Sequence, residues 1–353
     1  MEYPNRIAHI LHDMKIGGVE NAARYHLQNT DDNYKIFCLG TADFDYIGKC
    51  EPGDVVFRHV TESRLAYGFR LLRELNDFDA DLIVSSLWRG HLFSFFFSVV
   101  FSKKWVSFFH SSRSFHFLDY ISTKLALRYC CTAFCDSKST ESFIKLIRPR
   151  AISQLVSFYF KPQLEFIGPW NKRASRASFF GRLSKVKNLT YLFELISLIN
   201  KNKNLILDVY GVGEDESYLK SYVVANKLEK LIVFKGAISP DLVSKCMSNY
   251  KYYFQTSTFE GMAISVVQAM SVKCCCFVTF VGEINNYAID GVNAVAIPIN
   301  DVDEAVKKIL ITIDDHASCY NMSENAYETF SGYDDFSASF EFACRKVILN
   351  LEP

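Results

Sequence analysis

A carboxylate, a glycine and the start of a helix stand together in Ser257–Met270, which reads STFEGMAISVVQAM. Glu260 and Gly261 follow the apolar run Lys251–Gln255, which predicts a buried strand, and they precede apolar residues at helical spacing. The free amides and the dipole at a helix start bind phosphate, and a carboxylate at a strand end can accept hydroxyl groups. Gln268 lies about two helical turns beyond Glu260, so both side chains can face one ligand. The stretch predicts a site for a polyhydroxylated anion; a surface glutamate on an ordinary strand–loop–helix is the alternative.

Two cations accompany a second strand end. The predicted strand that ends at Phe180 is followed by Gly181, Arg182 and, after a short loop, Lys187. Arg presents a planar fork of donors and Lys a point charge, so the two can converge on a diphosphate. A pair of solvated loop cations is the alternative.

A histidine and two glycines mark further strand ends. His110 directly follows the predicted strand Trp105–Phe109, at the edge where parallel sheets place ligand groups, although a lone histidine can also be structural. Gly17 and Gly18 lie between the predicted strand Ile7–Leu11 and a helix, where glycine lets the backbone approach a ligand. The pattern is not GxGxxG, so a dinucleotide-binding fingerprint is not supported.

Composition bears on the class of protein. The 353 residues include 39 Lys plus Arg and 39 Asp plus Glu, so no net field favours nucleic acid as a partner. The 11 cysteines show no paired metal-ligand spacing, which favours buried thiols in a reducing compartment over a metal site or disulfides. Met1–Leu11 carries charged residues and a proline and does not resemble a secretory signal. We therefore expect a cytoplasmic protein.

The elements that must position these residues follow an α/β rhythm. Short apolar runs alternate with helical patterns along nearly the whole chain, which predicts parallel α/β layers. The rhythm is lost between about Gln154 and Trp170 and restarts afterwards, so this segment reads as a linker between two domains. Further strands are expected at Tyr34–Cys38, Asp54–Phe57, Asp81–Ser85, Cys130–Cys135, Leu205–Tyr210, Leu231–Phe234, Cys274–Val278 and Val295–Ile297.

One helical stretch is rich in phenylalanine. His91–Ser102 carries serines at every fourth position and is apolar elsewhere, and its apolar run is too short to span a bilayer. It is either a helix buried on most sides or a helix in a membrane interface, with Lys103, Lys104 and Trp105 at headgroup level. The basic residues that follow suit phosphate or anionic lipid, or they form a solvated helix face. These residues are Arg113, His116, Lys124 and Arg128.

Taken in order along the chain, these pieces resemble glycosyltransferase family 4, the retaining nucleotide-sugar transferases of GT-B fold. The resemblance is strongest from Phe179 to Pro298 and thinner in the first half. The motifs that carry it are Gly17-Gly18-x-Glu20, His110, Gly181-Arg182-Leu with Lys187-Asn188, Tyr210-Gly211-Val-Gly213-Glu, Phe234-Lys-Gly236 and Glu260-Gly261-Met-Ala-Ile-Ser.

This resemblance implies two Rossmann-like α/β domains facing across a cleft. The acceptor-side domain is expected at 1–165, with a helix at about 335–353 packing back on it, and the nucleotide-sugar-binding domain at 170–332. The implied activity is transfer of a sugar from a UDP- or GDP-sugar to a hydroxyl acceptor, with retention at the anomeric carbon and without a metal or other cofactor.

Roles for individual residues follow from the resemblance as well. Arg182 and Lys187 would hold the donor diphosphate, Glu260 the donor-sugar hydroxyls, and His110 would orient the sugar. Donor contacts are also expected at Gly17, Gly18, Gly211, Gly236, Ala237, Gly261, Met262, Ala263, Ile264 and Gln268.

The sequence departs from the family pattern at three places, one of which is the linker Gln154–Phe160, where the usual asparagine-containing phrase is missing. Gln268 stands where the family has its second glutamate. Its amide oxygen can accept a hydrogen bond from a hydroxyl group, but this bond lacks the added strength that a charged carboxylate gives. Asn285 and Asn286 stand where proline and glutamate are common. Donor binding could therefore be weakened or redirected.

The phenylalanine-rich helix and the basic residues suggest a lipid-linked saccharide acceptor at the inner face of the plasma membrane. Such an acceptor fits assembly of a bacterial surface polysaccharide such as O-antigen or capsule. Two alternatives are a nucleotide-sugar epimerase of the same fold and a catalytically idle nucleotide-sugar-binding partner of another transferase.

Overall fold

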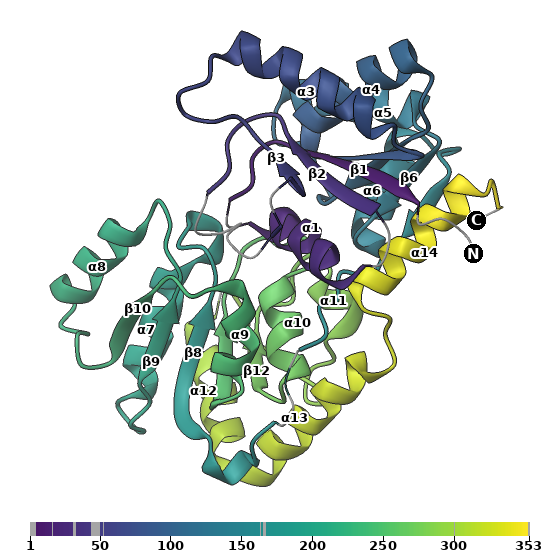
Figure 1. Ribbon diagram of the computed structural model, residues 1–353. Coiled ribbons are helices and arrows are strands. Elements are labelled where there is room, and N and C mark those ends of the chain that lie inside the picture. The colour runs from purple at the N-terminus through teal and green to yellow at the C-terminus, as the bar shows by residue number, and fades with distance from the viewer. Residues whose placement is uncertain are drawn as a thin grey trace. The chain divides into compact units, whose positions relative to one another are not determined.

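The computed structural model describes residues 5–15, 17–30, 33–43, 50–51, 53–162, 164, 167–299 and 301–351. The chain forms two compact units, Met1–Phe160 with Asp334–Pro353, and Lys161–Tyr333 (Figure 1). Each unit is built on one parallel sheet covered by helices, as the α/β rhythm predicts. The sequence predicts that the chain passes from the first domain to the second between residues 165 and 170, and back to the first near residue 335.

The first unit contains a seven-stranded sheet in the order β3-β2-β1-β4-β5-β6-β7, and every strand pair in it is parallel. Its strands are β1 (Arg6–Leu11), β2 (Asn33–Cys38), β3 (Val55–Val56), β4 (Leu82–Ser86), β5 (Trp105–Phe109), β6 (Thr132–Cys135) and β7 (Ser153–Leu155). Its helices are α1 (Gly18–Asn29), α3 (Arg64–Phe78), α4 (Leu87–Phe101), α5 (Phe117–Tyr129), α6 (Lys138–Ile147) and α14 (Phe336–Ile348). The direction of strand order reverses between β1 and β4, the point where open α/β sheets bind ligands.

The two faces of this sheet carry different helices. In Figure 1, α3, α4 and α5 cover one face, while α1 and α14 lie together on the other. On the second face, Phe336 and Phe340 of α14 pack on Phe108 with ring centroids 6.2 and 6.1 Å away. The final helix therefore completes the core of the first unit, although the whole second unit precedes it in the chain.

The edge strand β7 was not expected, because Ser153–Leu155 lies in the segment whose pattern loses regularity. Its three residues are half-buried or exposed and pair on one side only, with β6. An edge strand of this length has no apolar alternation that a sequence pattern could reveal.

The phenylalanine-rich helix α4 is covered along most of its surface and exposed along one side. Its serine stripe points inward, since Ser94 is fully buried, whereas Phe96, Val99 and Val100 are 64%, 63% and 71% exposed. Leu87–Phe101 thus turns an apolar strip to solvent while its other residues are covered, and the two interpretations of this helix stay open.

The headgroup position considered for Trp105 is wrong, and Lys103 and Lys104 make contacts within the first unit. Lys103 pairs with Asp79 at 2.5 Å, and Trp105 is 2% exposed. Lys104 Nζ donates to the Ile348 carbonyl at 2.8 Å and so satisfies the C-terminal end of α14. All three residues hold the first unit together.

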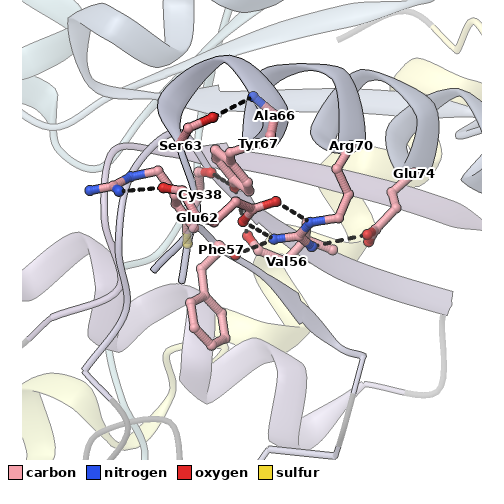
Figure 2. A network of polar contacts seen from close by, with 10 residues as sticks. Cys38, Val56, Phe57, Glu62, Ser63, Ala66, Tyr67, Arg70 and Glu74 are labelled. Atoms are coloured by element: carbon pink, nitrogen blue, oxygen red, sulfur yellow. Dashed lines mark hydrogen bonds and ion pairs between the residues drawn. The ribbon is translucent and has the colours of Figure 1, made fainter. Parts of the chain in front are cut away.

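A network of polar contacts fastens the loop before α3 to that helix (Figure 2). Arg70 donates to both carboxylate oxygens of Glu62, from Nε at 3.0 Å and from Nη2 at 2.8 Å. It also donates to Glu74 at 3.0 Å and to the Phe57 carbonyl at 2.8 Å. The hydrogen bonds from Arg70 hold the pKa of Glu62 below its ordinary value. A bidentate guanidinium–carboxylate pair of this kind fixes loop geometry, so this network is structural.

The second unit contains a six-stranded parallel sheet in the order β10-β9-β8-β11-β12-β13. Its strands are β8 (Ala174–Phe180), β9 (Leu207–Tyr210), β10 (Ile232–Gly236), β11 (Tyr250–Gln255), β12 (Cys275–Val278) and β13 (Val295–Ala296). Its α-helices are α7 (Leu189–Ile199), α8 (Glu216–Ala225), α9 (Pro240–Met247), α10 (Ile264–Ser271), α11 (Ile284–Tyr287), α12 (Val302–Asp314) and α13 (His316–Ser331), and two short 3₁₀ turns are η1 (Trp170–Lys172) and η2 (Lys185–Lys187). The strand order reverses between β8 and β11, which brings the segments after these two strands to one point of the sheet edge.

Among the described residues, no helix combines the length and the hydropathy that a membrane span requires.

Candidate functional site

The switch point of the second sheet brings Lys187 and Glu260 together. Lys187 ends η2 and Glu260 follows β11, and Nζ lies 2.6 Å from Oε1. The two side chains are only 17% and 10% exposed. A buried pair of this geometry is sensitive to the loss of either partner, because the other charge is then left in a poorly solvated place. The structure therefore joins two of the four residues for which catalytic roles were predicted.

Gln255 is a site residue that sequence reasoning missed. Its Nε2 donates to Glu260 Oε1 at 2.7 Å, and its own Oε1 accepts from Tyr253 at 2.5 Å and from Ser265 at 2.8 Å. Burial raises the pKa of Tyr253 well above its ordinary value, so its hydroxyl stays protonated and donates. The signal was a lone amide at the end of the otherwise apolar strand YKYYFQ. The fully buried Gln255 amide orients the Glu260 carboxylate by this hydrogen bond.

The turn after Glu260 is held in a tight main-chain geometry. Ala263 has φ 54°, in the left-handed region, where a non-glycine residue costs roughly 1–2 kcal/mol. Across the turn, a Cβ on Gly282 would lie 1.9 Å from the Glu260 carbonyl oxygen, so only glycine fits there. The amide of Glu283 then donates to the Gly261 carbonyl at 3.2 Å. The strained turn opens α10 at Ile264, where the first amides of a helix have no partner inside it.

The remaining predicted residues of this turn lie near Glu260 without binding its carboxylate in the contacts described. Met262 accepts at its carbonyl from Tyr287 Oη at 3.3 Å. Gln268 is half-buried on α10. Its predicted role beside Glu260 stays a prediction.

Arg182 pairs with Glu214 in this structure. Its side chain is 74% exposed, and Nε donates to Glu214 Oε2 at 3.0 Å. Surface pairs of this kind contribute little to stability, so the guanidinium can exchange partners easily. Its predicted role at a diphosphate stays a prediction.

The two glycines after β9 allow the loop after β9 to pack closely against the loop after β8. A Cβ on Gly211, which has φ +128°, would lie 1.9 Å from the Gly181 carbonyl oxygen, and one on Gly213 would lie 2.2 Å from the Leu183 carbonyl oxygen. The amide of Gly211 in turn donates to the Gly236 carbonyl at 2.8 Å. These contacts fix the loop that carries Arg182. Ala237, which follows Gly236, is exposed.

The first unit carries the other predicted residues around the ends of its central strands. Gly17 is the N-cap residue of α1, and a Cβ there would lie 2.1 Å from Glu20 Oε2. Gly18 begins the helix and is exposed. Burial raises the pKa of Glu20 above its ordinary value, and its own amide and the nearby His110 act against this rise.

In the contacts described, His110 has a hydrogen-bond partner at one ring nitrogen, Nε2, and none at the buried Nδ1. Nε2 lies 3.0 Å from Ser86 Oγ, and Nδ1 lies 3.7 Å from Asp136 Oδ2. The side chain is 8% exposed. The residue as a whole is half-buried, so its exposed surface belongs largely to the main chain. Phe108 and Phe158 flank the ring, with centroids 4.2 and 5.4 Å away.

Within the described part of the chain, no group of three or more His, Cys, Asp or Glu side chains is placed to hold a metal ion. The groups present are an ammonium, an exposed guanidinium, a buried carboxylate and a helix start. They can neutralise a phosphate and bind hydroxyl groups.

Comparisons with known proteins place this arrangement in context. Residues 160–329 match the family model described as Glycosyl transferases group 1. The poly(glycerol-phosphate) alpha-glucosyltransferase of Bacillus subtilis is 26% identical over 179 residues, which cover 49% of this chain and 26% of that enzyme. The poly(ribitol-phosphate) alpha-N-acetylglucosaminyltransferase of Staphylococcus aureus is 27% identical over 93 residues, which cover 26% of this chain and 18% of that enzyme. The matches thus span about a quarter or less of these relatives.

A solved structure covers the whole fold. HepE from Anabaena, in complex with UDP-glucose, superposes with a TM-score of 0.83 at 17% identity, over 98% of this chain and 100% of HepE. The predicted fold class, two Rossmann-like α/β domains of the GT-B type, is confirmed.

Proposed function

We propose that this protein is a glycosyltransferase that moves a sugar from a UDP-sugar to a hydroxyl acceptor. The observation that carries the proposal is the buried Lys187–Glu260 pair at the switch point of the second sheet. It lies inside residues 160–329, the segment that matches the group 1 glycosyltransferase model. The UDP-glucose complex of HepE supports the choice of a uridine donor over GDP.

The proposed chemistry needs charge stabilisation more than a protein base. Lys187 and the helix start after Ala263 neutralise the diphosphate as it leaves, and Arg182 joins them when it releases Glu214. Glu260, oriented by Gln255, accepts bonds from donor-sugar hydroxyls. We propose that the acceptor hydroxyl attacks the anomeric carbon from the side on which the diphosphate leaves. The leaving phosphate oxygen takes the proton of that hydroxyl, and the anomeric configuration is retained. The word alpha in the names of both curated relatives supports retention. No metal or other cofactor is required by this scheme.

The acceptor we propose is a hydroxyl of a bacterial surface polymer. The two curated relatives are named for poly(glycerol-phosphate) and poly(ribitol-phosphate), which favours a polyol-phosphate chain of the teichoic acid type. A lipid-linked saccharide of O-antigen or capsule type is the second candidate, supported by the exposed apolar face of α4.

A donor screen tests the proposed activity. A ligand that binds only the native state raises its apparent stability, by about 2.7 kcal/mol at a hundredfold excess over Kd. We expect UDP-sugars to raise the Tm of the protein, GDP- and dTDP-sugars to raise it less, and one UDP-sugar to be consumed when a polyol-phosphate or a lipid-linked saccharide is added.

Other outcomes point to the alternatives. Binding without turnover over any acceptor would favour an idle sugar-nucleotide-binding partner, and conversion of the donor to an epimer would favour an epimerase. If no sugar nucleotide changes the Tm, the proposed donor site is wrong.

We also propose that the outer face of α4 and α5 contacts an anionic membrane, which would place the protein in the cytoplasm at the inner face of the plasma membrane. On α4, Phe96 and Val100 are 64% and 71% exposed, and on α5 Phe117 is 74% exposed. Phe95 of α4 contacts Tyr129 of α5 with tilted rings whose centroids are 5.0 Å apart, so the two helices form one surface. Exposed cations on α5 add attraction for anionic lipid, at about 1 kcal/mol each. They are Lys124 and Arg128.

Vesicle flotation tests this contact. We expect the protein to float with phosphatidylglycerol vesicles and less with phosphatidylcholine vesicles, and the double variant Phe96→Ser/Val100→Ser to lose most of this binding. Val224→Ser is the matched control, because Val224 is 61% exposed on α8 of the other unit. Equal flotation of the double variant and the control, or a dimer in solution that the double variant dissociates, would show that this face does not serve lipid.

A further inference from the structure

A chain of hydrogen bonds runs through the first unit and ends at His110. Its members are Tyr34 of β2, His9 of β1, Ser86 at the end of β4, and His110 after β5. These strands are neighbours in the sheet order β2-β1-β4-β5. The links measure 2.6 Å from Tyr34 Oη to His9 Nδ1, 2.9 Å from His9 Nε2 to Ser86 Oγ, and 3.0 Å from Ser86 Oγ to His110 Nε2.

Asp136, after β6, lies at the far side of His110. Its Oδ2 is 3.7 Å from His110 Nδ1, and its Oδ1 accepts from Thr140 Oγ1 at 2.7 Å. Asp136 is 6% exposed, His9 is 1% exposed and Ser86 is fully buried. These side chains are thus shielded from water, and the buried His110 Nδ1, which has no hydrogen-bond partner in the contacts described, has the Asp136 carboxylate as its nearby charged neighbour.

The hydrogen-bond series from Tyr34 to His110 can be assigned donors and acceptors without conflict in one direction only. Burial raises the pKa of Tyr34 well above its ordinary value and lowers that of His9 well below, so the phenol keeps its proton and the imidazole is neutral. If Tyr34 donates to His9 Nδ1, then His9 donates from Nε2 to Ser86, and Ser86 donates to His110 Nε2. His110 then carries its proton on Nδ1, toward the Asp136 carboxylate.

The reverse direction leaves two groups badly placed. His9 would donate from Nδ1 to Tyr34, whose own hydroxyl proton would need another acceptor beside these rings. His110 would then present the lone pair of Nδ1 to the Asp136 carboxylate, which is repulsive.

We propose that Ser86 and His9 are positioning residues that hold the His110 imidazole as its Nδ1–H tautomer, with that proton directed at Asp136. The ring is thereby tied to β4 on one side and faces β6 on the other, and the main chain at the end of β5 is held with it. The consequence for sugar transfer rests on the proposed function and on the sequence-based prediction that His110 orients the donor sugar. The tautomer itself does not depend on that function.

Nitrogen-15 NMR of the histidine-labelled protein tests the tautomer directly. We expect the His110 signals, assigned by their loss in His110→Gln, to show a protonated Nδ1 and an unprotonated Nε2 at neutral pH. In Ser86→Ala the Nε2–H form should become populated, because the donor that keeps Nε2 an acceptor is gone. Ser86→Thr, which retains the hydroxyl, should restore the original signals. A wild-type spectrum dominated by Nε2–H, or one that Ser86→Ala leaves unchanged, would overturn the proposal.

Kinetics then separate positioning from structure. We expect Ser86→Ala to lower kcat about tenfold, as for the loss of one oriented hydrogen bond, with an unchanged Kd for the UDP-sugar and recovery in Ser86→Thr. An unchanged kcat, or a fall that Ser86→Thr does not reverse, would contradict the positioning role. If the wild-type protein transfers no sugar but shows the expected tautomer, the proposed function fails and the hydrogen-bond chain stands.

Discussion

Replacing Lys187 by glutamine should lower the rate of sugar transfer by about 10²–10³-fold, the usual cost of removing one oriented donor from a site of developing charge. Lys187 is the least exposed cation at the switch point of the second sheet, with its side chain 17% exposed. Glutamine removes the charge and shortens the side chain by one atom, so Glu260 keeps its bond from Gln255 but loses its cation, and we expect the Tm to fall while the fold persists. The measurement is kcat with a UDP-sugar donor, together with the Tm of the variant.

Lys185→Gln is the matched control for this prediction. Lys185 lies in the same 3₁₀ turn, two residues earlier, and it is exposed. It should retain the wild-type rate. Near-normal turnover in Lys187→Gln would remove the second-unit site from the mechanism.

Replacing Glu260 by glutamine should lower kcat/KM by about 10²-fold, because hydroxyl groups of the donor lose a charged acceptor. The carboxylate binds Lys187 and Gln255 through the same oxygen, Oε1, so the three side chains act as one unit. The double variant Lys187→Gln/Glu260→Gln should therefore cost little more than the worse single variant. The double-mutant cycle in kcat/KM measures this coupling.

Glu216→Gln serves as the control, since Glu216 pairs with Lys220 on the surface of α8. Full additivity of the two site substitutions would mean that Lys187 and Glu260 act on the donor separately. A rate unaffected by Glu260→Gln would rule out its role in donor binding.

The arrangement of strands could be predicted from the sequence because buried parallel strands carry their own signal. The runs Ile7–Leu11 and Trp105–Phe109 are apolar and short, and each is followed by a helical pattern or a turn. The resulting sheets place the ends of β8 and β11 side by side, and with them Lys187 and Glu260. The pairing of these two residues follows from topology that a sequence pattern can indicate.

The partners inside the site could not be predicted in the same way. Gln255 reads as the end of a strand, and its bond to Glu260 depends on the path of the turn that follows. Ser86 and His9 lie 77 residues apart in sequence and meet through strand register. Trp105 is a different kind of error. A tryptophan beside two lysines fits a membrane interface by residue type, but the Trp105 indole is buried and donates a hydrogen bond to Ser85 Oγ of the neighbouring strand. Residue type indicates what a side chain can do, and register decides which neighbour it meets.

The order in which the chain is made gives α14 a particular importance. Phe336 and Phe340 cover Phe108, and Phe340 also stacks on His9 of β1, yet a ribosome reaches them only after all of Lys161–Tyr333. At 5–20 residues per second, the nascent first unit waits roughly ten to thirty seconds with one sheet face uncovered. During that interval the exposed aromatic face is a target for chaperones and for aggregation, whereas the second unit has every one of its strands and helices available as soon as it emerges.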